Sequence, residues 1–457
     1  MKNPVRTPGF HGFCLEDQVM INLTLANPSG REQAFLNRNV QSTLDWELLW
    51  ETIRLNDVAP LVHSRLQALG LLNRIPAEVR NPLEKRHLEI TERNRHRLIQ
   101  TTELFRRFHA AGVSVIVLKG VLFAETIYHD IGYKKMNDLD LLVPFRDVEK
   151  VKVVYRETGL IPLALLEGGD EPLDENRNYH LPACISRDLT FVVGTHWNLC
   201  SPKRGFAISM SELWARSVPV SIGETPVRAL SIIDVLHHLI VHFHYYKNGL
   251  KELADFANWI RAHEPFPWDL MKSEIDRAKT WTPAFRTLSL VSTIYGTAVP
   301  EDLLQSCSDH SEPWTRRDTQ KLLHRKDLLL RSRSTYSSEI EKAYLSFTFE
   351  NRFEQKLPLF FTFWVRLLFP PLEILHRTNS VRPGEHSWLW LWTLNLWRTS
   401  REVGKTYGLA IFFLLMGKSL AELATSGFGR QPDRMAELRE ELGTDEKRIR
   451  ELLNSMD

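Results

Sequence analysis

Two aspartates, Asp138 and Asp140, stand one residue apart inside the apolar run Met136–Val143. Side chains alternate along a β-strand, so both carboxylates are expected on the same face. A lone buried carboxylate is costly, and two neighbouring carboxylates repel each other unless a cation lies between them. Hard divalent cations take oxygen ligands of this kind. The pair therefore predicts half of a Mg²⁺ (or Mn²⁺) site, with Asp138 and Asp140 as metal ligands.

The dipeptide Lys119-Gly120 precedes this strand and follows the β-branched run Val113–Leu118. It stands where a strand is expected to turn into a helix, which is a natural place to hold a phosphate. Gly120 allows the backbone to approach the phosphate closely, and Lys119 adds a point charge. The alternative for Lys119 is a side chain that only extends to solvent at a domain edge.

Short strands between long helical segments are predicted around these residues. Strands are expected near 113–118, 137–143 and 188–194, in one sheet. Helices are expected over 77–111, 121–129, 232–246, 250–263, 268–278 and 283–295. Residues 1–40 show little periodicity. The fold class is therefore α+β, with a small mixed sheet embedded between α-helical regions.

Five regions follow from this reading. They are a loose N-terminal lead-in (1–40), an N-terminal helical region (41–111), an α/β core (112–220), a helical domain (221–345) and a C-terminal helical region (346–457).

The composition is that of an ordinary globular protein, with 43% hydrophobic and 25% charged residues. A formal net charge of +2 is too small to indicate nucleic acid or a membrane surface by itself. The 4 cysteines have no zinc-finger spacing and are expected to be reduced thiols. We find no signal peptide and expect no membrane span, which predicts a cytoplasmic protein.

The motifs follow one another in a fixed order along the chain: Asp45-Trp46, Val117-Leu118-Lys119-Gly120, Tyr128, Asp138–Val143, His196-Trp197, and a helical motif of His237–His244 with Lys247, Leu250 and Asp255. In this order they resemble the uncharacterised bacterial nucleotidyltransferase family of the DNA polymerase β-like superfamily. The resemblance covers about residues 45–260. It implies an enzyme that moves a nucleotidyl group from a nucleoside triphosphate to an acceptor hydroxyl with the help of Mg²⁺, with Asp138 and Asp140 as catalytic residues. The acceptor, whether small molecule, protein or RNA, does not follow from it.

The resemblance also suggests roles for three further residues. Lys134 and Lys135 stand where the family tends to have an arginine, so they are assigned to the γ-phosphate; a solvated turn is equally consistent. His196 is assigned to orienting a carboxylate or contacting a base, with a hydrogen-bonded core histidine as the alternative. Together with Lys119 and Gly120, these form the predicted nucleotide-binding set.

The third carboxylate of the superfamily is expected two residues before the His-Trp pair, and Gly194 occupies that position. Asp188 is roughly 20 Å away along the strand, too far to replace it in the same register. Acids of the polar segment after the sheet's early strands remain candidates: Glu167, Glu171, Asp174 and Glu175. Gly194 therefore leaves a second hypothesis open, a catalytically reduced relative that binds nucleotide or a protein partner.

Overall fold

The computed structural model describes residues 13–41, 43–162, 178–188, 190–200, 205–245 and 249–311, with short pieces at 315–316, 319–320, 323, 361 and 387–394. The chain divides into two compact units, Met1–Arg331 with Arg434–Asp457, and Ser332–Asp433. All elements below belong to the first unit. In the second, residues 388–394 are helical, and most of the predicted C-terminal helical region lies outside the described residues.

The first unit contains a seven-stranded sheet with the order β3-β4-β5-β2-β1-β7-β6. Its strands are β1 (Ile116–Val117), β2 (Leu139–Leu142), β3 (Ile161–Pro162), β4 (Cys184–Ile185), β5 (Val192–His196), β6 (Val218–Ile222) and β7 (Thr225–Ala229). The pairs β2–β5 and β1–β7 are parallel and the other pairs are antiparallel. The prediction of an α+β fold with a mixed sheet is confirmed, and the three predicted strands lie in this one sheet.

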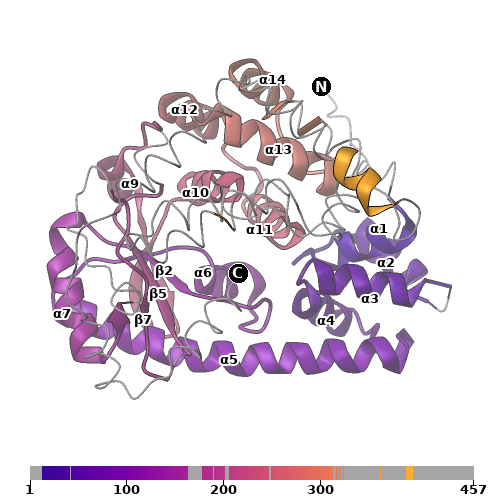
Figure 1. Ribbon diagram of the computed structural model, residues 1–457, viewed down its shortest axis with the longest axis horizontal. Helices are drawn as coiled ribbons and strands as arrows, with labels where there is room; N and C mark the ends of the chain where they lie inside the picture. Colours follow the sequence, from indigo (N-terminus) through magenta and orange to yellow (C-terminus); the bar gives the residue numbers. More distant parts are fainter. Residues whose placement is uncertain are drawn as a thin grey trace. The chain divides into compact units, whose positions relative to one another are not determined.

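Helices make up most of the remainder (Figure 1). The N-terminal set is α1 (Leu15–Leu23), α2 (Gly30–Asn39), α3 (Trp46–Leu55), α4 (Ala59–Ala68) and α5 (Ala77–Ala110). Near the sheet lie α6 (Val121–Phe123), which continues as the π-helical turn η2 (Ala124–Tyr128), α7 (Val148–Thr158) and α9 (Met210–Arg216). The last set is α10 (Ile232–Tyr245), α11 (Leu250–Ala262), α12 (Trp268–Ala278), α13 (Trp281–Tyr295) and α14 (Glu301–His310).

The prediction of a loose lead-in over residues 1–40 is wrong for its described part. Helix α1 is a core element: its successive residues Val19, Met20 and Ile21 are all buried. Three consecutive buried residues cover most of a helix's circumference, so α1 has no polar face and shows no amphipathic period. Asn258 of α11 holds the segment that follows α1, because its side-chain oxygen accepts from the Ala26 amide at 2.8 Å.

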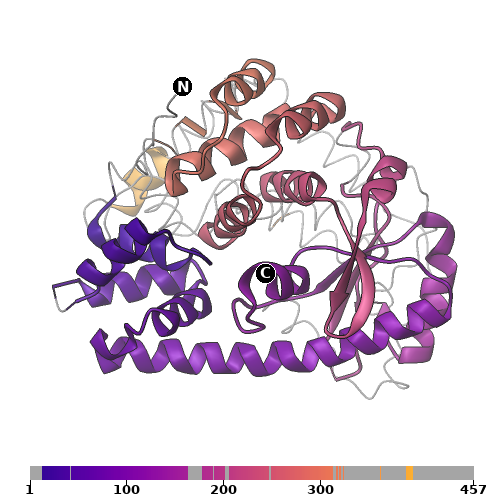
Figure 2. The ribbon, with the colours of Figure 1, turned by 180° about the vertical axis from the view of Figure 1, so that it is seen from behind.

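Helix α5 spans 34 residues and links the N-terminal helices to the sheet. It packs against α4 near its start and against α7 and β7 near its end, as both views show (Figures 1 and 2). The predicted range of 77–111 agrees with its observed bounds. The second half of α5 therefore lies beside the sheet.

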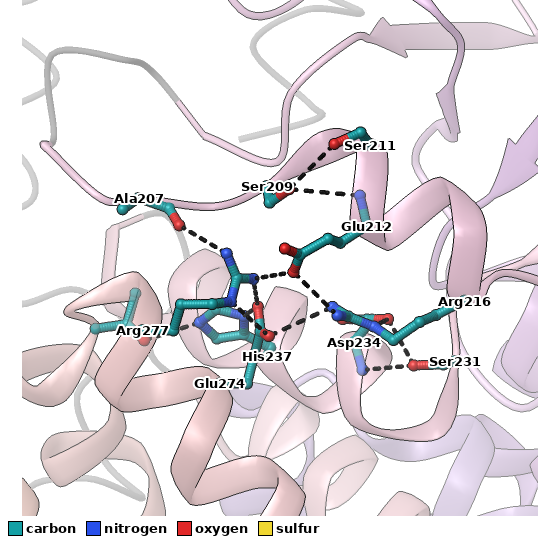
Figure 3. A network of polar contacts seen from close by, with 11 residues as sticks. Ala207, Ser209, Ser211, Glu212, Arg216, Ser231, Asp234, His237, Glu274 and Arg277 are labelled. Carbon is teal, nitrogen blue, oxygen red and sulfur yellow. Dashed lines mark hydrogen bonds and ion pairs between the residues drawn. The ribbon is translucent and has the colours of Figure 1, made fainter.

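A buried polar network joins α9 to the start of α10 and to α12 (Figure 3). Arg216 of α9 donates to Asp234 of α10 at 2.6 Å and lies 3.4 Å from Glu274 of α12. His237 contacts Thr280 at 2.8 Å, immediately after α12. Because Asp234 and Glu274 are both buried, each carboxylate requires such a partner. The network fixes the start of α10 against α9 and α12.

No helix among the residues that the structure describes is long and apolar enough to cross a membrane. The four cysteines are free thiols, as expected.

Candidate nucleotide-binding site

A pocket of about 680 Å³, part of it open to solvent, lies between the sheet and helices α10 and α11. Six of the predicted site residues line it: Lys119, Gly120, Lys134, Lys135, Asp138 and Asp140. The remaining one, His196, lies beside Asp140 on the neighbouring strand β5. The fold thus brings together residues from the β1–α6 turn, the segment before β2, and β2 itself.

In this pocket, Asp140 is held by two basic side chains. Its Oδ2 receives the Lys119 ammonium at 2.9 Å, and its Oδ1 lies 3.4 Å from His196 Nε2. The Lys119 ammonium also contacts His242 Nε2 of α10 at 2.7 Å. The side chains of Asp140 and Lys119 are only 11% and 17% exposed. The protein therefore supplies its own cation to this carboxylate.

The charges of the pair stabilise each other despite burial. Burial by itself raises the pKa of the Asp140 carboxyl, but Lys119 and then His196 hold that pKa well below its usual range. Burial likewise lowers the pKa of Lys119, yet Asp140 and Asp138 outweigh it, so the pKa lies above its ordinary value. Asp140 is therefore an anion and Lys119 a cation near neutral pH.

Asp138 precedes β2 by one residue, is half-buried and lines the same pocket as Asp140. Arg97 of α5 approaches from outside the sheet and donates to the Thr190 carbonyl at 2.9 Å. Burial, followed by repulsion from Arg93, lowers the pKa of Arg97 to about 10, and Asp138 opposes this shift. Each aspartate of the pair thus has a basic side chain in its vicinity.

The Lys119-Gly120 turn has the geometry that its sequence suggests. Gly120 adopts a φ of +58°, which L-residues rarely occupy. Its carbonyl accepts from the Tyr133 hydroxyl at 2.9 Å, and Tyr133 stacks on Tyr128 with ring centroids 4.1 Å apart. The Leu118 amide donates to the Asp140 carbonyl at 3.0 Å. The turn is thereby tied both to the acidic strand and to the segment before it.

The two lysines before β2 have different surroundings. Lys134 is buried and forms an ion pair with Asp255 of α11, which also accepts from the Tyr128 hydroxyl at 2.8 Å. Lys135 is half-buried; burial and then the neighbouring Arg93 lower its pKa. The geometry gives Lys134 a positioning contact with α11, whereas Lys135 adds to a group of positive charges at the pocket.

A family model described as uncharacterised nucleotidyltransferase matches residues 42–296, more than half of the chain. The chain belongs to this uncharacterised nucleotidyltransferase family. No curated protein and no solved structure matches the chain. The matched region contains the whole sheet and every residue of the pocket.

Gly194 lies where the third carboxylate was expected, because it is paired in parallel register with Asp140. A Cβ at this position would lie 2.7 Å from Asp140 Oδ1 and 3.4 Å from His196 Nε2. The carboxylate of Asp140 thus fills the space above Gly194. Asp188 lies in the turn before β5, where it accepts from Thr190 at 2.8 Å. The other candidate acids, Glu167, Glu171, Asp174 and Glu175, lie outside the described residues.

The described residues contain no group of three or more His, Cys, Asp or Glu side chains arranged to hold a metal ion. Mg²⁺, however, is often held by only one or two carboxylates together with waters and substrate phosphates. Two aspartates on one pocket wall beside a basic group fit that donor set. The residues of this pocket therefore fit a metal ion that arrives with a phosphate ligand better than one held by the protein alone.

Several residues of the site could not be assigned from the sequence. In the sequence, His238 and His242 stand at the i,i+4 spacing of a possible zinc pair, which gives no reason to link His242 to Lys119. In the structure His242 contacts Lys119, whereas His238 is buried with neither ring nitrogen hydrogen-bonded. Tyr133 carries no local signal, because its contact to Gly120 comes from the tertiary fold. Asp255 belongs to the predicted helical motif, but its pairing with Lys134 likewise comes from the tertiary fold.

Proposed function

We propose that this protein is a Mg²⁺-dependent nucleotidyltransferase that moves a nucleotidyl group from a nucleoside triphosphate to an acceptor hydroxyl. The observation that carries the proposal is the convergence of Asp138, Asp140, Lys119 and Gly120 in one pocket of a chain that belongs to a nucleotidyltransferase family. A cytoplasmic location and an acceptor that is a small molecule, a protein or an RNA complete the proposal.

Each residue has a role that its surroundings support. Asp138 and Asp140 would hold Mg²⁺ (or Mn²⁺), which when bound neutralises charge on the phosphate oxygens. Lys119 and Lys135 would bind the phosphates, and the Gly120 turn would let the backbone approach them. Lys134 would contribute through its ion pair with α11, which positions the segment before β2.

His196 would orient Asp140, since its ring lies 3.4 Å from the carboxylate. It also packs near Tyr179 and His180, with ring centroids 5.9 and 5.5 Å away. These three half-buried rings lie next to the pocket, on the same side as Gly194. The acceptor would approach on that side.

One observation favours a second candidate, a catalytically reduced nucleotidyltransferase that binds nucleotide or a protein partner. Gly194 offers no carboxylate beside Asp140, and an acid there would assist removal of the acceptor's proton. Nucleotide binding needs only the two aspartates, Lys119 and the Gly120 turn, and all of these are present. The two candidates therefore agree on binding and differ on turnover.

The decisive binding experiment is the double variant Asp138→Asn with Asp140→Asn. Thermal unfolding is measured with ATP or GTP, with and without Mg²⁺. Wild type at a ligand concentration of 100 Kd should gain about 2.7 kcal/mol, and the double variant should lose the Mg²⁺-dependent part. A double variant that keeps the full gain would show that the aspartates do not bind the metal–nucleotide.

The matched control neutralises two carboxylates on α14, Asp302→Asn with Asp309→Asn. Asp302 pairs with Lys272 at 2.9 Å on the surface, and Asp309 accepts from Gln305. This control should keep the full nucleotide-induced gain. Turnover is then tested by incubating wild type with each labelled nucleoside triphosphate, Mg²⁺ or Mn²⁺ and cell extract; label on an acceptor supports transfer, and binding without transfer supports the reduced candidate.

A further inference from the structure

We propose that Lys119 is an exchangeable internal cation that neutralises Asp140 in the ligand-free protein and moves to the polyphosphate when nucleotide binds. The divalent ion would then bind tightly only together with the nucleotide. This inference rests on the proposed function and adds a rule for how the metal ion and the nucleotide bind together. It predicts that removing Lys119 strengthens the binding of the metal alone and weakens the binding of the metal–nucleotide.

The contacts of Asp140 are the first support. Both of its oxygens already face side chains of the protein, Oδ2 the Lys119 ammonium at 2.9 Å and Oδ1 the His196 ring at 3.4 Å. A metal ion on this carboxylate would lie within a few ångströms of the ammonium. At the effective dielectric of a partly buried site, like charges at such distances repel strongly. Metal and Lys119 therefore compete for Asp140.

Neighbouring acids do not remove this competition. Of the pocket's carboxylates on α11, Asp255 is paired with Lys134, and Glu252 lies 4.0 Å from the Lys251 ammonium. The second contact of the Lys119 ammonium, His242 at 2.7 Å, is to a ring nitrogen and not to an anion. Asp140 is thus the ion-pair partner of Lys119 in the described part of the pocket.

A polyphosphate can release this pair. Its oxygens offer several negative charges to an ammonium on a flexible four-carbon stem. Lys119 and Lys135 both line the pocket, so two ammonium groups are within reach of such a ligand. Once the ammonium contacts phosphate, Asp140 regains an oxygen for the metal. Metal and nucleotide should therefore bind with strong positive coupling, which must be reciprocal.

The test compares MnCl₂ titrations by calorimetry, without nucleotide, for wild type, Lys119→Met and Lys119→Arg. Lys119→Met should bind Mn²⁺ at least tenfold more tightly than wild type, because the competing charge is gone. Lys119→Arg keeps the charge and should resemble wild type. Titration of ATP in saturating Mn²⁺ should show the opposite order, with Lys119→Met about tenfold weaker than wild type.

Lys251→Met is the matched control, since it removes a positive charge from the same pocket wall without contacting Asp140. It should change the affinity for Mn²⁺ alone less than threefold. If Lys119→Met does not fold, Lys119→Gln replaces it, because its amide can still donate to Asp140 without a charge.

Equal Mn²⁺ affinity in wild type and the neutral Lys119 variants would overturn the proposal. So would an equal gain in Lys251→Met, because the effect would then be general electrostatics. If wild type binds no Mn–ATP, the proposed function fails, and the titrations with Mn²⁺ alone still decide whether Lys119 competes for Asp140.

Discussion

Replacing Gly194 tests the electrostatics of the site most directly, because an acid and its neutral isostere can be compared at one position. A Cβ there would lie 2.7 Å from Asp140 Oδ1, so any side chain displaces that carboxylate by several tenths of an ångström. Gly194→Asp and Gly194→Asn share this steric cost. They differ only in whether a third negative charge stands beside Asp138 and Asp140.

The steric part should lower the free energy of unfolding of both variants by about 1–3 kcal/mol, as overpacking usually does. The charge adds a second cost to Gly194→Asp alone. Two carboxylates about 4 Å apart at an effective dielectric of about 20 repel by up to about 4 kcal/mol. Lys119 and His196 already contact Asp140 and offset part of this repulsion. We expect Gly194→Asp to be about 1–2 kcal/mol less stable than Gly194→Asn.

The assay is thermal unfolding in EDTA and then in millimolar Mn²⁺. In EDTA, Gly194→Asp should melt about 2–6 °C below Gly194→Asn. Mn²⁺ should reverse the order, since three carboxylates hold a divalent ion and the asparagine variant offers only two. If the missing acid limits turnover, Gly194→Asp should also raise nucleotidyl transfer, by up to about 10²–10⁴-fold.

Equal melting temperatures of the two variants in EDTA, together with no difference in their response to Mn²⁺, would refute this reasoning. Position 194 would then not face Asp140 as the register of β2 and β5 requires.

Two further predictions concern the surroundings of the site. Tyr133→Phe removes the hydroxyl that donates to the Gly120 carbonyl at 2.9 Å, so the dissociation constant of Mg–ATP should rise about five- to tenfold, as expected for one lost hydrogen bond. His237→Gln tests a pH dependence: burial lowers the pKa of His237 to about 4 although Glu274 opposes the shift. The unfolded state takes up a proton near the ordinary histidine value and the folded state does not, so wild type should lose about 2 kcal/mol more than His237→Gln between pH 7 and pH 5 in urea titrations.

Each of these has a control. Tyr295→Phe removes a buried hydroxyl that contacts Thr24 at 2.9 Å outside the pocket; it should lower stability without changing nucleotide affinity. Equal dissociation constants for Tyr133→Phe and Tyr295→Phe would contradict the positioning role of Tyr133. Parallel stability losses of wild type and His237→Gln from pH 7 to pH 5 would show that His237 does not titrate as its burial implies.

Some features of this protein follow from local sequence alone. Asp138 and Asp140 share a strand face because alternation is a property of the single chain. Gly120 likewise permits a turn with positive φ because glycine has no Cβ, which is a property of that one residue. Helices such as α5 and α12 were predicted within one residue, because their amphipathic pattern and end signals lie within the segment.

Elements without such a pattern were missed. Helix α1 is buried on most sides and shows no period, and β6–β7 is a hairpin whose strands are partly exposed and whose turn is the short Gly223-Glu224. In both cases stability comes from packing against distant segments, as with Asn258 holding the residues after α1. Local propensity carries little information about such contacts.

The chemistry of the site was likewise decided by tertiary structure. The sequence could name Lys119, Asp140 and Gly194, but not that Lys119 is paired with Asp140, or that Asp140 occupies the space above Gly194. His242, 123 residues from Lys119, joins them only because α10 packs against the sheet. Residue types and local spacing determine which groups can act as ligands, whereas the electrostatic state of each group depends on neighbours that only the folded chain brings within a few ångströms.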